Sequence, residues 1–247
     1  MKQLYTFLIS MLVAVGAHGQ DRTVQNRPYT DLRPFHFGVV VGSHVQDMEL
    51  NNVGPQIITD ADGNASSALV SVDQNRWDFG INVGVLGEVR LNTYFQFRLA
   101  PMMYFGTRHM EFHDLLNVDD EGRPAVARQD LKTAYISVSG DMIFAAPRFN
   151  NHRPYLMAGV APMVNLTGKS SDYIRLKRFS MALECGVGCD FYLPFFKLRP
   201  ELKFVYGLGN QLDKKHASQL TDKSMLKYAQ SVNEAHTKMI VLSFYFE

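Results

Sequence analysis

The chain has 247 residues, of which 20 % are charged, and its formal net charge is +1 at pH 7. No proline-rich, serine-rich or charged linker divides it, which favours a single domain over two small ones. Because 25 basic residues nearly balance 24 acidic ones, no strong electrostatic field attracts nucleic acid, and no nucleic-acid partner is predicted.

The first 19 residues have the three parts of a secretory signal peptide. Lys2 precedes the apolar run LYTFLISMLVAV, and Ala17-His18-Gly19 then places small residues at the first and third positions before a cleavage site. The apolar run is shorter than the ~20 residues that a membrane-spanning helix needs. No later window approaches about 18 unbroken apolar residues, so a membrane-inserted form of the exported chain would have to be a β-barrel.

Alternation of apolar and polar residues predicts eight strands. In the stretch RWDFGINVGVLGEV, side chains such as Trp77, Phe79, Ile81 and Val83 occupy every second position, which places them on one face of a strand. Each segment with this pattern is long enough to cross a bilayer core when tilted, which takes about 9–11 residues. The predicted strands cover residues 35–45, 76–89, 94–108, 133–145, 154–166, 178–192, 197–208 and 237–246.

The predicted connections differ in length in a regular way. Long connections cover 46–74, 109–131 and 209–236, an intermediate one covers 167–176, and short ones cover 89–93, 147–152 and 194–196. Short turns on one rim and long loops on the other are typical of outer-membrane barrels, as are aromatic residues near both rims. A soluble barrel or sandwich would instead hide its apolar face and expose the charged one to water.

The sequence therefore predicts an all-β fold, an eight-stranded antiparallel up-and-down transmembrane β-barrel with short periplasmic turns and long extracellular loops. We expect three parts: a signal peptide at 1–19, a polar periplasmic N-terminal segment at 20–34, and an integral outer-membrane barrel at 35–247. Within the last long connection, TDKSMLKYAQSVNEA at 221–235 has the spacing of a short helix through Leu226, Ala229 and Val232.

The face opposite the apolar one carries charged side chains that would point into the barrel. The interior of an eight-stranded barrel is only wide enough for side chains, so these charges should pair across it rather than line a channel. The predicted lumen charge network consists of Asp78, Arg98, Asp141, Glu184, Arg199, Glu201 and Lys203.

No catalytic arrangement is predicted. Ser43 and His44 are adjacent, so a regular strand points them to opposite faces, and no G-x-S-x-G motif occurs. Cys185 and Cys189 share one face of a strand, but four residues separate them by roughly 13 Å, too far for a disulfide. We therefore predict two free thiols, no enzyme activity, no metal site, no cofactor and no small-molecule substrate.

Four segments are distinctive: FHFGVVVGSH in the first predicted strand, NNHRPYLMAGVAP, GVGCDFYLPFFKLRPELKFVYGLGN and the terminal SFYFE. These segments resemble the PorT family of outer-membrane barrels, which is associated with the type IX secretion system. The stretch TAYISVSGDMIFAAP departs from the fourth-strand pattern of the family. The resemblance implies a role in exporting proteases and adhesins that carry a C-terminal signal, with other secretion components as partners, and it supplies no catalytic residues.

A filled barrel cannot itself pass a folded protein, so we expect an accessory or assembly subunit that acts beside the conduit. Besides outer-membrane lipid, its contacts would then be proteins that dock on the periplasmic turns. The candidate docking residues are Arg148, Asn150, His152, Phe195 and Phe196. The alternative is a structural or ligand-binding barrel of the OmpA or OmpX kind, which the residues alone do not separate from a secretion component.

Overall fold

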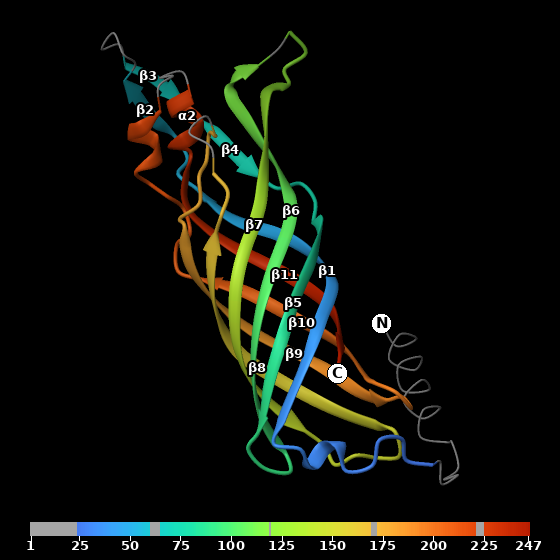
Figure 1. Ribbon diagram of the computed structural model, residues 1–247. Coiled ribbons are helices and arrows are strands. Elements are labelled where there is room, and N and C mark those ends of the chain that lie inside the picture. The colour runs from blue at the N-terminus through green and yellow to red at the C-terminus, as the bar shows by residue number, and fades with distance from the viewer. Residues whose placement is uncertain (1–23, 60–64, 119, 169–171, 221–224) are drawn as a thin grey trace, which may run out of the picture.

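Eight long antiparallel strands form a closed barrel. The computed structural model describes residues 24–59, 65–118, 120–168, 172–220 and 225–247, so the predicted signal peptide lies outside the described residues. Neighbouring strands follow the order β6-β5-β1-β11-β10-β9-β8-β7, and pairing of β6 with β7 closes the ring (Figure 1). These strands are β1 (Phe35–Asn52), β5 (Asp78–Arg90), β6 (Phe95–Val118), β7 (Pro124–Ala145), β8 (His152–Asn165), β9 (Phe179–Tyr192), β10 (Lys197–Leu208) and β11 (Val232–Phe246). The predicted eight-stranded up-and-down barrel is confirmed.

The apolar residues of the strands face outward, as the alternation predicts. On β5, the side chains of Phe79, Ile81 and Val83 are 66 %, 51 % and 40 % exposed, whereas Asp78 and Asn82, at the alternate positions, are buried. An exposed apolar belt around a closed barrel is the surface that lipid covers. None of the helices in the described residues is long and apolar enough to cross a membrane.

Two strands run further than predicted. β6 continues to Val118 and β7 begins at Pro124, so most of the predicted loop 109–131 is instead a two-stranded extension of the barrel wall. Figure 1 shows this hairpin projecting past the body of the barrel. In the extension the pattern of polarity is inverted: Met110 and Phe112 point inward and are buried, while charged side chains alternate with them. This inversion follows because water, not lipid, surrounds this part of the wall.

Short elements cover the same end of the barrel. They are β2 (Gln56–Thr59), β3 (Ala65–Ala68), β4 (Val70–Asp73), a 3₁₀ turn at His216–Gln219 and the helix α2 (Leu226–Ala229). β2 and β3 form a hairpin, and β4 pairs with β6. The predicted helix over 221–235 is thus wrong in extent: Val232 already belongs to β11, where its side chain is buried, and 221–224 lie outside the described residues.

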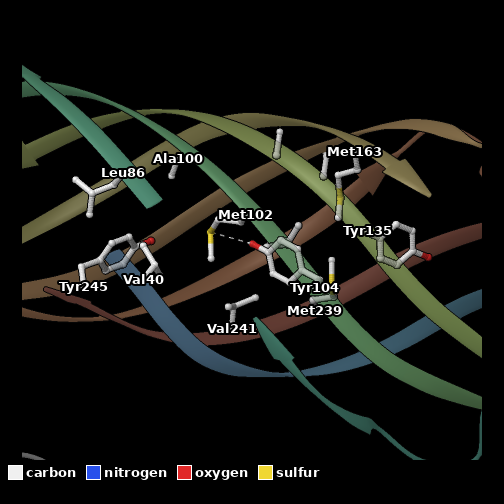
Figure 2. Close-up of a cluster of buried hydrophobic side chains, with 13 residues drawn as sticks. Val40, Leu86, Ala100, Met102, Tyr104, Tyr135, Met163, Met239, Val241 and Tyr245 are labelled. Carbon is white, nitrogen blue, oxygen red and sulfur yellow. Dashed lines mark hydrogen bonds between the residues drawn. The ribbon is translucent and has the colours of Figure 1, made fainter. Parts of the chain in front are cut away.

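The barrel interior is filled with side chains along its length. Midway, a cluster of buried apolar and aromatic residues from all eight barrel strands includes Tyr104, whose hydroxyl donates to Met102 Sδ at 3.5 Å (Figure 2). Figure 2 shows Met239, Val241 and Tyr245 pointing into the same space from β11. Because the walls of an eight-stranded barrel lie so close together, side chains from opposite strands meet and leave no channel.

Candidate functional site

Arg98 on β6 is one of two fully buried arginines of the lumen network. Its guanidinium lies 3.0 Å from Asp141 Oδ2 on β7 and 2.8 Å from Glu201 Oε2 on β10, and all three side chains are fully buried. The Tyr155 and Tyr245 hydroxyls each donate to Glu201 at 2.8 Å. The Tyr245 ring also lies under the guanidinium, 4.6 Å from centroid to Cζ. These contacts connect five strands, β6, β7, β8, β10 and β11, across the lumen.

Two more groups of charges involve β10. Arg199 contacts Glu88 on β5 and Asp190 on β9, and Lys203 Nζ lies 2.7 Å from Glu184 Oε2 on β9. β10 therefore carries an inward-facing row of three charged residues. Arg199 contacts β5 and β9, Glu201 contacts β6, and Lys203 contacts β9. The structure brings together six of the seven predicted network residues in this way.

Asp78 is the seventh predicted residue, and the structure places it apart from the others. Its carboxylate accepts the His109 backbone N–H at 2.7 Å and lies 2.7 Å from Nδ1 of the same residue. Arg76 lies at the rim, and its Nε is 3.3 Å from Asp78 Oδ1. Alternation predicts correctly that Asp78 is buried, but its depth, at the extracellular end of β5, separates it from the network.

The N-terminal segment closes the periplasmic end. Figure 1 shows residues 24–34 running across the end of the barrel at which β1 begins. Asn26 donates through its side chain to the Tyr192 carbonyl at 3.0 Å, and Arg148 lies over the Tyr192 ring at 3.7 Å from the centroid. Asp31 contacts the same tyrosine and lies 3.6 Å from Arg153. The sequence indicates the polar character of this segment but not that it folds back on the barrel.

The five candidate docking residues have different surroundings. Arg148 is engaged with the N-terminal segment, and Asn150 has φ +51° in a tight turn and accepts from Arg148 Nε at 2.8 Å. The His152 ring packs edge to face against Phe191, and the ring centroids of Phe196 and Phe246 are 6.0 Å apart. Phe195 differs from all of these because it is 92 % exposed.

The extracellular end is closed by apolar residues. Buried Met110 and Phe112 pack with β4 and with the loops before β9 and β11. Phe112 contacts the rings of Tyr173 and Tyr228 edge to face at 5.3 and 5.5 Å. Next to them Lys227 donates to Asp114 at 2.8 Å, and this hydrogen bond raises the pKa of Lys227.

The histidines do not form a nucleophilic site in the described part of the chain. His44 is buried in the lumen, while Ser43, the preceding residue of β1, faces outward. His109 is oriented by Asp78, which lies 2.7 Å from its Nδ1, and no hydrogen bond joins it to a serine, threonine or cysteine among the described residues. No group of three His, Cys, Asp or Glu in the described ranges is arranged to hold a metal ion, and Cys185 and Cys189 are free thiols.

One family model and several solved structures are similar to the chain. No curated protein sequence matches the chain. Similar solved structures include OprG from Pseudomonas aeruginosa, with 12 % identity over 86 % of this chain and 94 % of that one and a TM-score of 0.48. Neisserial surface protein A has 12 % identity over 86 % and 98 % with a TM-score of 0.38, and Ail of Yersinia pestis has 13 % over 87 % and 99 % with 0.35. Residues 20–213 match the family model described as outer membrane protein beta-barrel domain, so the chain belongs to that family and is an integral protein of the outer membrane.

Proposed function

We propose that this barrel is a non-enzymatic component of type IX protein secretion that acts beside the conduit as an accessory or assembly subunit. The observation that carries the proposal is the filled lumen. Ion pairs occupy its periplasmic half, an apolar cluster closes its extracellular end, and the N-terminal segment crosses the periplasmic opening. A barrel filled in this way cannot conduct a folded protein. The resemblance of its sequence to the PorT family supports a role in type IX secretion.

Deletion of the gene tests the process. Cargo with a type IX C-terminal signal is quantified in the medium, on the cell surface and in the periplasm, with complementation by the wild-type chain. We expect cargo to accumulate in the periplasm of the deletion strain. Normal secretion with an altered envelope would instead support the alternative, a structural or ligand-binding barrel of the OmpA or OmpX kind.

We further propose that protein partners contact the periplasmic turn that contains Phe195. An aromatic side chain that is 92 % exposed next to a membrane rim can bury its whole surface in a partner or in the lipid interface. A photo-crosslinking amino acid in place of Phe195 should give adducts with secretion components. The same substitution at Phe196, which already packs on Phe246, is the matched control. Adducts with lipid alone would contradict a docking role.

A further inference from the structure

We propose that the outer wall carries a binding site for a glycolipid of the extracellular leaflet, a role that is independent of the proposed part in secretion. The site is a groove on β5, β6 and β7 near the extracellular rim, which we call the outer-rim groove. It consists of a shallow surface cavity of about 710 Å³, which we call the apolar cavity because aromatic and aliphatic side chains supply much of its lining, and a pocket of about 390 Å³ lined mainly by polar residues. Both are lined by Arg76 and His109, so they form one continuous depression.

The lower part of the outer-rim groove is suited to an acyl chain. Phe79, Ile81 and Phe105 line it and are 66 %, 51 % and 38 % exposed on the lipid-facing wall. Thr107, two residues after Phe105 on β6, also lines this part and leaves space there, because its side chain is small. Trp77, the one tryptophan of the sequence, marks the upper limit of the apolar surface, as interfacial tryptophans do.

The upper part of the groove presents both hydrogen-bond donors and hydrogen-bond acceptors. The pocket is lined by Asn75, Arg76, His109, Glu111, Arg128 and Asp130, together with Met110. The side chains of Arg76, Arg128 and Asp130 are 66 %, 76 % and 69 % exposed, so they can contact a ligand without first leaving a packed core.

Internal contacts hold this pocket in shape. Asp78 fixes the His109 ring through the 2.7 Å contact with Nδ1, which leaves Nε2 on the side of Asp130, 3.8 Å away. Arg128 Nε donates to Glu111 at 2.9 Å, and Asn75 donates to the other carboxylate oxygen of Glu111. Groups that are already positioned lose less conformational entropy when a ligand binds.

The mixture of groups indicates which ligand fits. Sugar hydroxyls both donate and accept hydrogen bonds, so a site with carboxylates, guanidinium groups and an amide can satisfy them. Glu111 and Asp130 would repel an unaccompanied phosphate, which argues against a simple anion site. The apolar cavity that continues from the pocket argues against a free oligosaccharide. A lipid with a sugar head group is the ligand that matches both parts.

Titration of the purified full-length mature barrel in phosphatidylcholine nanodiscs tests the proposal, with Trp77 fluorescence as the signal. The probes are rough lipopolysaccharide, its delipidated core oligosaccharide and phosphatidylglycerol. We expect a saturable change with lipopolysaccharide and binding at least tenfold weaker for the other two probes. Equal binding of phosphatidylglycerol, equal binding of the oligosaccharide, or no saturable change would each overturn the proposal.

Two variants locate the site. Arg128→Gln with Asp130→Asn should weaken lipopolysaccharide binding at least tenfold, and Thr107→Phe, which fills the apolar cavity, should do the same. The matched control is Glu49→Gln, which removes an exposed ion pair with Lys238 outside the groove and should leave binding unchanged. Heat-modifiable gel migration checks that each variant is folded. Wild-type affinity in both folded groove variants would refute the assignment.

Discussion

Removing the positive charge of Arg98 should destabilise the barrel strongly. Arg98 is fully buried and pairs with two fully buried carboxylates, Asp141 and Glu201. Breaking a buried ion pair by removing one partner costs about 3–5 kcal/mol, because the remaining charge stays buried without compensation. Arg98→Met keeps much of the side-chain volume but leaves both carboxylates unpaired. We therefore expect a loss of about 3–5 kcal/mol in the free energy of unfolding.

The measurement is urea unfolding of the barrel refolded in detergent, followed by the fluorescence of the single tryptophan, Trp77, on the lipid-facing side. Differences between variants come from the transition midpoints, provided that the urea dependence of the unfolding free energy is unchanged. The matched control is Arg128→Met. The Arg128 side chain is 76 % exposed and pairs with Glu111, so its removal should cost only about 0–1 kcal/mol.

A third variant separates charge from packing. Arg98→Met combined with Asp141→Asn and Glu201→Gln removes every formal charge of the group while keeping its approximate volume. If unpaired charge causes the loss, this variant should recover at least half of it, because neutral polar groups cost less to bury. Equal stability of Arg98→Met and the wild type would refute the reasoning, and so would a triple variant no more stable than the single one.

Three further predictions follow from the position of side chains relative to lipid and lumen. Val83→Arg, near the middle of the apolar face of β5, should lower the unfolding free energy by about 2–4 kcal/mol, while Leu115→Arg on the extracellular hairpin should change it by less than about 1 kcal/mol. Equal losses of the two variants in urea unfolding would contradict the assignment of the membrane belt. Proteoliposomes that contain the barrel should show no swelling in isotonic sugar, because the lumen is filled; sugar uptake above that of empty liposomes would disprove a closed barrel. Cys185, which is exposed to lipid, should react with an apolar maleimide in the folded protein and not with a charged thiosulfonate. Unfolding in urea should make both Cys185 and Cys189 reactive toward either reagent, and an unreactive unfolded chain would indicate a disulfide.

The inward or outward direction of a side chain could be predicted from the sequence because it depends only on the period of the strand. Residues two apart share a face whatever the rest of the chain does. Ile81 and Val83 therefore face lipid, and Asn82 between them is buried, as the pattern predicts. Six lumen charges that alternation placed inside also lie together across the barrel.

The length of the strands beyond the membrane could not be predicted from the same rule. Within the bilayer the apolar residues point outward, but in the extension of β6 the apolar Met110 and Phe112 point inward. A reading that looks for one apolar outer face ends the strand at 108, where the surroundings change from lipid to water. The backbone pairing with β7 continues through this change.

The alternation pattern also could not predict how deep in the barrel a side chain lies or which distant residues it contacts. Alternation gives Asp78 the same direction as the other lumen charges, but the register of β5 against β6 decides that it meets His109 at the rim instead. The closure of the periplasmic end depends on contacts between residues more than 120 positions apart, such as Asn26 with Asn151. No local period carries that information.

The number of strands determines where this protein can act. Eight strands enclose an interior in which facing side chains touch, so Arg98 on β6 meets Glu201 on β10 and Arg199 on β10 meets Glu88 on β5. These contacts stabilise one arrangement of the wall and leave no passage for a solute. Any ligand or partner must then bind at an end of the barrel or on its outer wall. The exposed periplasmic Phe195 and the outer-rim groove are surfaces of these two kinds, and they lie on opposite sides of the membrane.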